Sequence, residues 1–335
     1  MSLSNLSIVI PTYNGALYLA DAIDSIQKQT TLPIEIIVVD DCSTDESVSV
    51  AQKLSEESIV PIRLVRLLSN SGGPSAPINV GVKEASGELI LVLDQDDMLE
   101  ERALQDLENA LQLVPRALCA FHLAGVFENR SERRTISSNE TIQKIDSAIP
   151  IGSGSRVAEK GTLLEILVQH GGNLVVGYPG FAFRRSAFLE KGGVSEDLKI
   201  AGDMELVGWL FRTGASVYVP RIGYYRRLHD QNVCRNARKV SFEIALVLGN
   251  LCAVSSNGVN NTVRDAAIAK IGGYAYWFRK ANLFNQAVLL YKSLKQVGVS
   301  RGTIFVLVSK CYVEMSWAKI TRRRPTYSTY TGDST

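Results

Sequence analysis

The chain has 335 residues, of which 46% are hydrophobic and 21% are charged, and its formal net charge at pH 7 is +2. This composition excludes a disordered protein and leaves room for one large domain with a smaller appendage. A net charge so close to zero gives no support to nucleic-acid binding, so no nucleic-acid partner is expected.

The cysteines and the apolar runs bear on the cellular compartment. The five cysteines are widely spaced and form no CxxC pair, which is typical of reduced thiols and not of a disulfide framework or a zinc site. The N-terminal residues lack a signal-peptide pattern, and no apolar window reaches the length of a membrane span. We therefore expect a cytoplasmic protein.

The first hundred residues alternate between strand and helix patterns. Apolar runs predict the strands, and amphipathic or capped stretches predict the helices between them. The predicted strands are 6–10, 34–39, 62–68 and 88–93, and the predicted helices start at 19, at a capping box over 43–46 and at 75, the last one closed by Gly87. This alternation predicts an α/β fold with a doubly wound, mostly parallel sheet flanked by helices.

The pattern changes twice in the remainder of the chain. Further strands are predicted at 118–123, 175–183 and 216–219, and the polar stretch 128–160 is interpreted as a mobile flap or an insertion. The later part is helical over 242–254, 263–280 and 286–296. We therefore expect an α/β domain over 1–238, a helical extension over 239–321 and a disordered basic tail over 322–335.

The strongest functional signal is the end of the fourth strand. The apolar run Glu88–Leu93 leads directly into Asp94, Gln95, Asp96 and Asp97. Three carboxylates at the end of a buried strand repel one another and cannot be buried without a cation. Clustered carboxylates suit Mg²⁺ or Mn²⁺, whereas the alternative is an ordinary acidic turn. We favour a divalent metal site that receives an anionic ligand.

Three other strand ends carry polar residues that should meet the acidic cluster at one edge of the sheet, where ligands bind in such folds. They are Pro11–Gly15, Asp40–Asp41 and Asn70–Gly73. The Asp pair could accept a hydrogen bond from a nucleobase or ribose or could only cap a helix, and the glycine loop could approach a phosphate or could only form a turn. The chain has no Walker A loop and no EF-hand spacing, which removes two common alternatives.

Two further residues are candidates for the chemistry. Asp203 lies at a predicted helix start, where it is either a simple N-cap or an ionised carboxylate able to take a proton from a hydroxyl. His229 follows an arginine-rich stretch and could ligate a metal or lie on the surface. His122 lies on an apolar strand and is most simply a core residue.

Taken in order, these motifs resemble the inverting glycosyltransferases of family two, which have the nucleotide-sugar-binding GT-A fold. The resemblance runs from Ile8 to about Asn232 and depends on the order and spacing of its elements. They are Val9–Gly15, Ile36–Asp45, Asn79–Gly81, Ala85–Glu88, Leu93–Asp97, Gly192–Val194, Gly202–Asp203 and Tyr225–His229. The resemblance implies metal-dependent, inverting transfer from a nucleoside-diphosphate sugar, with a UDP-sugar favoured, to a glycan or lipid-linked acceptor in cell-surface polysaccharide synthesis.

The resemblance also implies roles for individual residues. Asp203 would be the catalytic base, and Asp96, with support from Asp97 and with His229 as a further candidate, would bind Mn²⁺ or Mg²⁺. The residues implied in donor binding are Pro11, Thr12, Tyr13, Asn14, Asp40, Asp41, Gly73, Asp94 and Gln95.

The chain departs from the family pattern at three positions: near Trp209 an arginine common on the helix that starts at Asp203 is replaced, with Arg212 a turn away, and the other two departures leave an alternative function open. Ile78 stands where an arginine is common, and Gly202 stands where a glutamate usually precedes the aspartate. The alternative is a catalytically degenerate nucleotide-sugar-binding or interaction protein of the same fold, against which the retained Asp96 and Asp203 argue. A nucleotidyltransferase is disfavoured because the first strand end has no glycine-rich loop with a basic residue.

The C-terminal region has two interpretations. Residues 303–320 and Arg322–Arg324 could touch the inner face of the plasma membrane, or they could form a packed helix with a solvated basic tail. Peripheral contact with that membrane face is the sharper of the two hypotheses.

Overall fold

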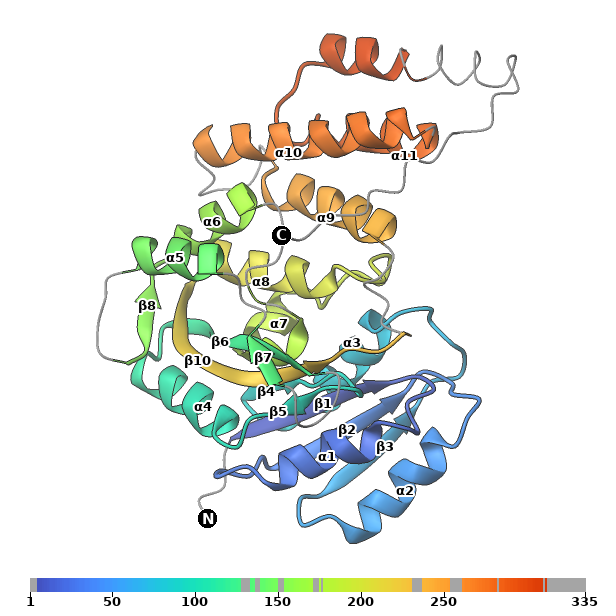
Figure 1. Cartoon of the computed structure of the whole chain (residues 1–335), viewed down its shortest axis with the longest axis vertical. Coiled ribbons are helices and arrows are strands. Elements are labelled where there is room, and N and C mark those ends of the chain that lie inside the picture. The colour runs from blue at the N-terminus through green and yellow to red at the C-terminus, as the bar shows by residue number, and fades with distance from the viewer. Residues whose placement is uncertain are drawn as a thin grey trace. The chain divides into compact units, whose positions relative to one another are not determined.

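The computed structural model describes residues 5–127, 133–135, 139–149, 154–170, 175, 177–230, 237–253, 261–281, 283–309 and 311. The chain divides into two compact units, Met1–Asn236 and Ala237–Thr335 (Figure 1). The predicted tail over 322–335 and most of the proposed membrane-contact segment lie outside the described residues.

One sheet runs through the first unit in the order β3-β2-β1-β4-β9-β6-β10-β5. Its strands are β1 (Leu6–Thr12), β2 (Glu35–Asp40), β3 (Ile62–Arg66), β4 (Leu89–Val92), β5 (Met98–Leu99), β6 (Ala117–Phe127), β9 (Phe181–Arg184) and β10 (Ala215–Arg227), with β7 (Arg133–Thr135) on β6 and β8 (Arg156–Ala158) on β10. The first four strands are parallel, with Val9 opposite both Ile37 and Val92. Because β9 enters antiparallel between β4 and β6, the sheet is parallel in its first half and mixed beyond it.

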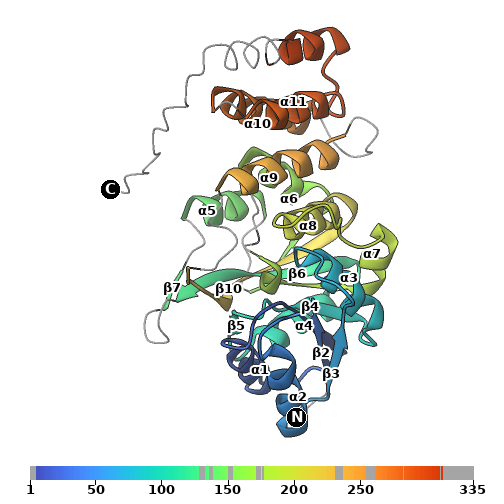
Figure 2. The same ribbon diagram turned by 90° about the vertical axis from the view of Figure 1, so that its right-hand side faces the viewer.

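Helices cover both faces of this sheet (Figure 2). One face carries α1 (Leu19–Gln27), α2 (Ser47–Glu57) and α4 (Ala103–Leu113), and the other carries α3 (Ser75–Glu84), α7 (Arg185–Lys191) and α8 (Gly202–Thr213). Strand alternation explains the division, because Ile8 and Ile10 join the core under α1 while Val9 faces α3. A Cβ at Gly81 of α3 would lie 2.3 Å from Val9 Cγ1, so only glycine permits this close helix–strand packing.

The start of α2 differs from the prediction. The capping box over 43–46 does not form, because the Ser43 amide donates to the Asp40 carboxylate and the Ser43 hydroxyl accepts the amide of Asn14. The helix begins at Ser47, whose amide donates to Asp45 Oδ1. Ser43 therefore organises the loop before the helix and does not cap it.

Other predicted boundaries shift by a few residues. Helix α3 ends at Glu84, three residues before Gly87. The strand expected over 175–183 begins only at Phe181, after a 3₁₀ turn over Tyr178–Gly180. Within the polar stretch 128–160, the described residues include β7, α5 (Asn139–Ala148) and β8, followed by α6 (Thr162–His170).

The second unit contains the three helices that the sequence predicts. They are α9 (Ala237–Leu251), α10 (Asn261–Lys280) and α11 (Phe284–Ser293). The buried residues of α10 recur every three to four positions, as expected for one apolar face: Val263, Ala267, Ile271, Ala275 and Phe278. Within the described ranges, no helix is long and apolar enough to cross a membrane.

Candidate active site

Neighbouring strand ends bring the predicted polar residues to one edge of the sheet. Thr12 at the end of β1 pairs with Asp40 at the end of β2, and Asp40 pairs with Arg66 at the end of β3. The acidic stretch 94–97 follows β4, which lies beside β1. The convergence expected from a parallel sheet is therefore present.

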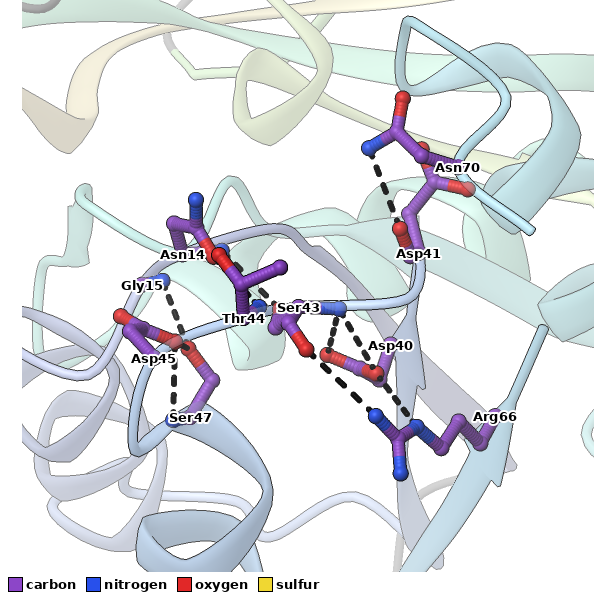
Figure 3. A network of polar contacts seen from close by, with 10 residues as sticks. All are labelled: Asn14, Gly15, Asp40, Asp41, Ser43, Thr44, Asp45, Ser47, Arg66 and Asn70. Carbon is purple, nitrogen blue, oxygen red and sulfur yellow. Dashed lines mark hydrogen bonds and ion pairs between the residues drawn. The ribbon is translucent and has the colours of Figure 1, made fainter. Parts of the chain in front are cut away.

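The carboxylate of Asp40 is almost completely enclosed by the protein. Its side chain is 1% exposed, its two oxygens lie 3.1 and 3.3 Å from the Ser43 amide, and Oδ2 lies 3.3 Å from Arg66 Nε (Figure 3). Asp40 therefore fixes the loop before α2, and its predicted donor-binding role would be exercised mainly through the shape of that loop.

Asp41 organises the glycine loop over residues 70–73. Its Oδ1 accepts the Ser71 amide and its Oδ2 accepts the Ser71 hydroxyl, both at 2.9 Å. Its own amide donates to the Thr12 carbonyl at 2.7 Å, and its carbonyl accepts Asn70 Nδ2 at 3.2 Å (Figure 3). This residue joins three strand ends into one rigid rim.

The loop after β1 is locked in an unusual backbone conformation. Asn14 and Cys42 are the two non-glycine residues with positive φ in the described part of the chain, at 48° and 61°. Asn14 is held because its Oδ1 accepts the Thr44 amide at 2.9 Å. Thr12 is buried, whereas Tyr13 remains 45% exposed at the rim, where its ring is available to a planar ligand.

Gln95 connects the acidic loop to this first loop. Its Oε1 accepts the Tyr13 amide and its Nε2 donates to the Tyr13 carbonyl, both at 3.0 Å. A Cβ at position 15 would lie 2.0 Å from Gln95 Oε1, so Gly15 is required for this contact. Both polar ends of Gln95 are thus engaged by the main chain, and the residue positions Tyr13.

Arg227 fixes the acidic loop from the opposite side. Its amide donates to Oδ1 of the buried Asp97 at 3.0 Å, and its Nε donates to the Asp96 carbonyl at 3.0 Å. Its guanidinium pairs with Asp21 on α1 at 2.7 Å and stacks over Tyr18 at 4.8 Å. Asp97 therefore supports the loop from within, while the Asp96 side chain remains at its surface.

Asp96 and His229 form a close pair. His229 Nε2 lies 2.7 Å from Asp96 Oδ2, and the imidazole packs against the ring of Tyr18 with centroids 4.9 Å apart. Both side chains are partly open to solvent. The sequence proposed these two residues as ligands of one ion, and the fold brings them together across more than a hundred positions.

The acidic loop holds more negative charge than its neighbours neutralise. Burial, followed by the charges of Asp96 and Asp203, raises the pKa of Asp94 to about 7, although Arg226 acts in the opposite direction. Burial, followed by the charges of Asp96 and Asp94, raises the pKa of Asp97 well above its usual range. Because Asp203 acts on Asp94, the predicted base and the acidic loop belong to one site.

The side chains of Asp96 and His229 fit a divalent cation whose remaining ligands come from a diphosphate. Among the described residues, no three His, Cys, Asp or Glu side chains converge on one point. Asp96 and His229 would supply two ligands to such an ion, and Mg²⁺-type ions in nucleotide sites are commonly held by one or two side chains together with phosphate oxygens. A cation beside Asp94 and Asp97 would favour their ionised forms, which burial and the neighbouring carboxylates now disfavour.

Asp203 is the second residue of α8, and its Oδ1 accepts the amide of Met204 at 2.7 Å. Gly73 packs directly on Lys199 in the segment before that helix, since a Cβ at Gly73 would lie 2.9 Å from Lys199 Cδ. Lys199 Nζ donates to the Ser71 carbonyl at 2.9 Å. The glycine loop and the start of α8 are therefore fixed to each other.

Sequence reasoning did not identify two tyrosines of the site. The hydroxyls of Tyr178 and Tyr224 are buried, and neither has a hydrogen-bond partner in the part of the chain that the structure describes. Burial and the nearby carboxylates raise the pKa of both hydroxyls well above the usual range. Tyr178 lies in an apolar stretch and Tyr224 directly before the arginine-rich stretch, and neither position separates a site tyrosine from an ordinary core residue.

Known proteins share both the sequence pattern and the fold. Residues 7–192 match the family model described as glycosyl transferase family 2. The poly(ribitol-phosphate) beta-N-acetylglucosaminyltransferase TarS of Staphylococcus aureus is 37% identical over 102 residues, which cover 30% of this chain and 18% of that protein. The poly(ribitol-phosphate) beta-glucosyltransferase of Bacillus spizizenii is 28% identical over 235 residues, which cover 67% of this chain and 36% of that protein. The chain thus spans well under two thirds of these relatives' lengths.

Solved structures agree on the fold. The structure of S. aureus TarS 1-349 in complex with UDP-GlcNAc has a TM-score of 0.66 at 17% identity. The aligned region covers 98% of this chain and 95% of the TarS chain. The mannosyltransferase PcManGT of Pyrobaculum calidifontis, in complex with GDP-Man and Mn²⁺, has a TM-score of 0.57 at 14% identity, covering 96% and 85%. The predicted GT-A fold is therefore confirmed, and the chain belongs to glycosyl transferase family 2.

Proposed function

We propose that the first unit is a metal-dependent, inverting glycosyltransferase that moves a sugar from a UDP-sugar to a glycan or lipid-linked acceptor in cell-surface polysaccharide synthesis. The observation that carries this proposal is the Asp96–His229 pair at 2.7 Å, in a loop where Asp203 is near enough to raise the pKa of Asp94. In this proposal the pair would hold the ion, and Asp203, which acts on the same loop, would be the base.

The rim supplies the donor-binding groups. Tyr13, held by Gln95, offers its ring to the nucleobase of the donor. The loop that Asp41 organises offers main-chain groups at Gly73 to the donor. Asp96 and His229 would hold Mn²⁺ or Mg²⁺, with Asp97 supporting Asp96 through Arg227. The bound ion would neutralise charge on the departing nucleoside diphosphate.

Asp203 carries out the proton transfer in this proposal. Its position in the first turn of α8 favours the ionised form through the helix dipole. Asp203 takes the proton of the acceptor hydroxyl while that oxygen attacks the anomeric carbon from the face opposite the diphosphate. An α-linked donor therefore gives a β-linked product.

The relatives narrow the candidate substrates. Solved structures of TarS 1-349 hold UDP and UDP-GlcNAc, and two curated relatives are named as poly(ribitol-phosphate) glycosyltransferases. We therefore propose UDP-GlcNAc and UDP-glucose as the first donors to test, with a polyol-phosphate polymer as one acceptor. GDP-mannose is the comparison donor, because PcManGT is described in complex with it.

The test measures donor binding and sugar transfer separately in the full chain, with and without Mn²⁺. We expect Asp96→Ala to lose metal-dependent donor binding by calorimetry. We expect Asp203→Asn to bind the donor within about twofold of wild type and to lose roughly 10³-fold in transfer rate, since general-base catalysis contributes about 10²–10⁴-fold. Asp197→Asn, in the exposed part of the segment before α8, is the matched control and should transfer normally.

Two results would contradict this scheme. Normal transfer by Asp203→Asn would show that this residue is not the base. Metal-dependent donor binding by the wild type without transfer to any acceptor tested would favour the catalytically degenerate alternative, to which Gly202 and Ile78 point.

A further inference from the structure

The first turn of α8 packs against the hydroxyl of Tyr178. A Cβ built on Gly202 would lie 2.5 Å from Tyr178 Oη and 3.2 Å from Ser75 Oγ. The first distance is shorter than a real Cβ contact, so the hydroxyl occupies the space of a side chain at position 202. The tyrosine oxygen therefore lies directly beside the backbone that carries Asp203.

This hydroxyl is a polar group without a partner of its own. It is buried, and the described residues offer it no hydrogen bond. Buried polar groups are almost always paired, so an unpaired one in a native fold calls for an explanation. The charges that act on it are those of Asp203, then Asp94 and Glu205, which together with burial keep it protonated. An ionised carboxylate can only accept a hydrogen bond, so toward Asp203 this protonated hydroxyl is the donor.

The surroundings hold this hydroxyl and the helix start in fixed positions. Tyr178 begins a 3₁₀ turn after Gly177, whose φ is 77°, and its ring stacks on Phe181 at 6.3 Å. The segment before α8 is tied to α3 because Ser75 Oγ donates to the Leu198 carbonyl at 2.8 Å. The positions of Tyr178 and of the first turn of α8 are therefore both fixed by the backbone and by packing.

We propose that Tyr178 is a positioning residue for Asp203. During transfer its hydroxyl donates a hydrogen bond to one oxygen of the Asp203 carboxylate and leaves the other oxygen to face the acceptor hydroxyl. A base that is held at one oxygen keeps its reactive oxygen in a productive direction. This inference rests on the proposed role of Asp203 as the base.

The first test compares Tyr178→Phe with Tyr218→Phe in the full chain. Tyr218 also has a buried hydroxyl that lacks a partner among the described residues, but its charged neighbours are Asp146 and Arg156 and not the site. We expect Tyr178→Phe to lower kcat about 10- to 100-fold while the donor KM and Kd stay within twofold. Tyr218→Phe should leave kcat, KM and Kd unchanged.

The second test needs no activity and checks where the hydroxyl lies. Gly202→Ala should lower Tm in the wild-type background because of the conflict with Tyr178 Oη. Removing the oxygen leaves the nearest ring carbon, Cζ, 3.7 Å from the new Cβ, an ordinary contact. Tyr178→Phe should therefore restore most of the Tm lost in Gly202→Ala, while kcat of the double variant stays low.

Each outcome decides the proposal. The proposal is overturned if Tyr178→Phe keeps the wild-type kcat, or if its donor KM rises by the same factor as its kcat falls. It is also overturned if Gly202→Ala loses the same Tm with Tyr178 present as with Tyr178→Phe. If wild type transfers, Asp203→Asn does not and Tyr178→Phe does, only the positioning role fails. If wild type transfers no sugar from any donor, the proposed function fails and the role of Tyr178 with it.

Discussion

Two strand ends of the same sheet carry the same sequence pattern and have different physical states. After β2, the buried carboxylates of Asp40 and Asp41 accept hydrogen bonds from Ser43 and Ser71. After β4, Asp94 is surrounded by other carboxylates, and its pKa is raised to about 7. The same pattern thus gives carboxylates that neighbouring loops satisfy after β2 (the scaffold end), and a carboxylate whose ionised form is disfavoured after β4 (the ligand end).

The largest expected effect tests the scaffold end. Asp41→Ala leaves the Ser71 amide and hydroxyl without their acceptor. Because hydrogen bonds to charged groups contribute about 1.5–3 kcal/mol each, we expect the free energy of unfolding to fall by about 3 kcal/mol in urea titrations. Asp41→Asn keeps one acceptor oxygen and should lose about 1 kcal/mol. Equal stability of Asp41→Ala and wild type would remove the distinction between the two strand ends.

The second effect has the opposite sign and tests the ligand end. In protein kept metal-free with EDTA, Asp94→Asn should be more stable than wild type at pH 8, because it removes a charge that its surroundings disfavour. The folded pKa of Asp94, about 7, is raised above the ordinary 3.8, so its contribution to stability is present below about pH 4 and is lost as the pH rises to 7.

The variant's advantage in Tm should therefore grow between pH 5 and pH 7 and then level off. Asp197→Asn, at an exposed position, should show no such trend. An advantage of Asp94→Asn that did not change with pH would show that the acidic loop is not under electrostatic strain.

The smallest effect returns to the scaffold end. Arg66 pairs with the buried Asp40, but its own side chain is 55% exposed. Exposed ion pairs contribute little because water and salt screen them, so Arg66→Ala should cost less than about 1 kcal/mol, and less still at high salt. A loss above about 2 kcal/mol in urea unfolding would mean that Asp40 depends on Arg66 and not on the Ser43 amide.

The sequence predicted the parallel half of the fold well because three of its four strands, β1, β2 and β4, are buried almost throughout, whereas β3 is partly exposed. All seven residues of β1 are buried, and such uninterrupted apolar runs are characteristic of parallel sheets. The polar strand ends could be grouped into one site because the carboxyl ends of parallel strands lie at the same edge of the sheet. His122 was also identified as a core residue, and it is buried with Nε2 3.2 Å from the Ala103 carbonyl.

Other features depend on long-range contacts that no local pattern contains. Nothing in Asp40–Asp41 reveals that Ser43 and Ser71 would satisfy these acids, so the sequence left a nucleotide-binding role and a capping role both open for this pair. The antiparallel entry of β9 and the hydroxyl of Tyr178 beside Gly202 are set by tertiary packing. The capping-box prediction was wrong because Ser43 was already bound by Asp40 and Asn14.

The pairing of β6 with β9 has a consequence for how such proteins diversify. Phe121 of β6 lies opposite Phe181 at the start of β9, and the two strands run in opposite directions. Between these two strands the chain contributes β7 and β8 to the same sheet, where β7 pairs with β6 and β8 pairs with β10. The stretch between β6 and β9 can therefore be exchanged only as a unit that brings equivalents of these two short strands, because β6 and β10 pair with them. Grafting the corresponding stretch of a relative between β6 and β9 is accordingly a route to chimeras that retain the donor rim and change what is presented beside it.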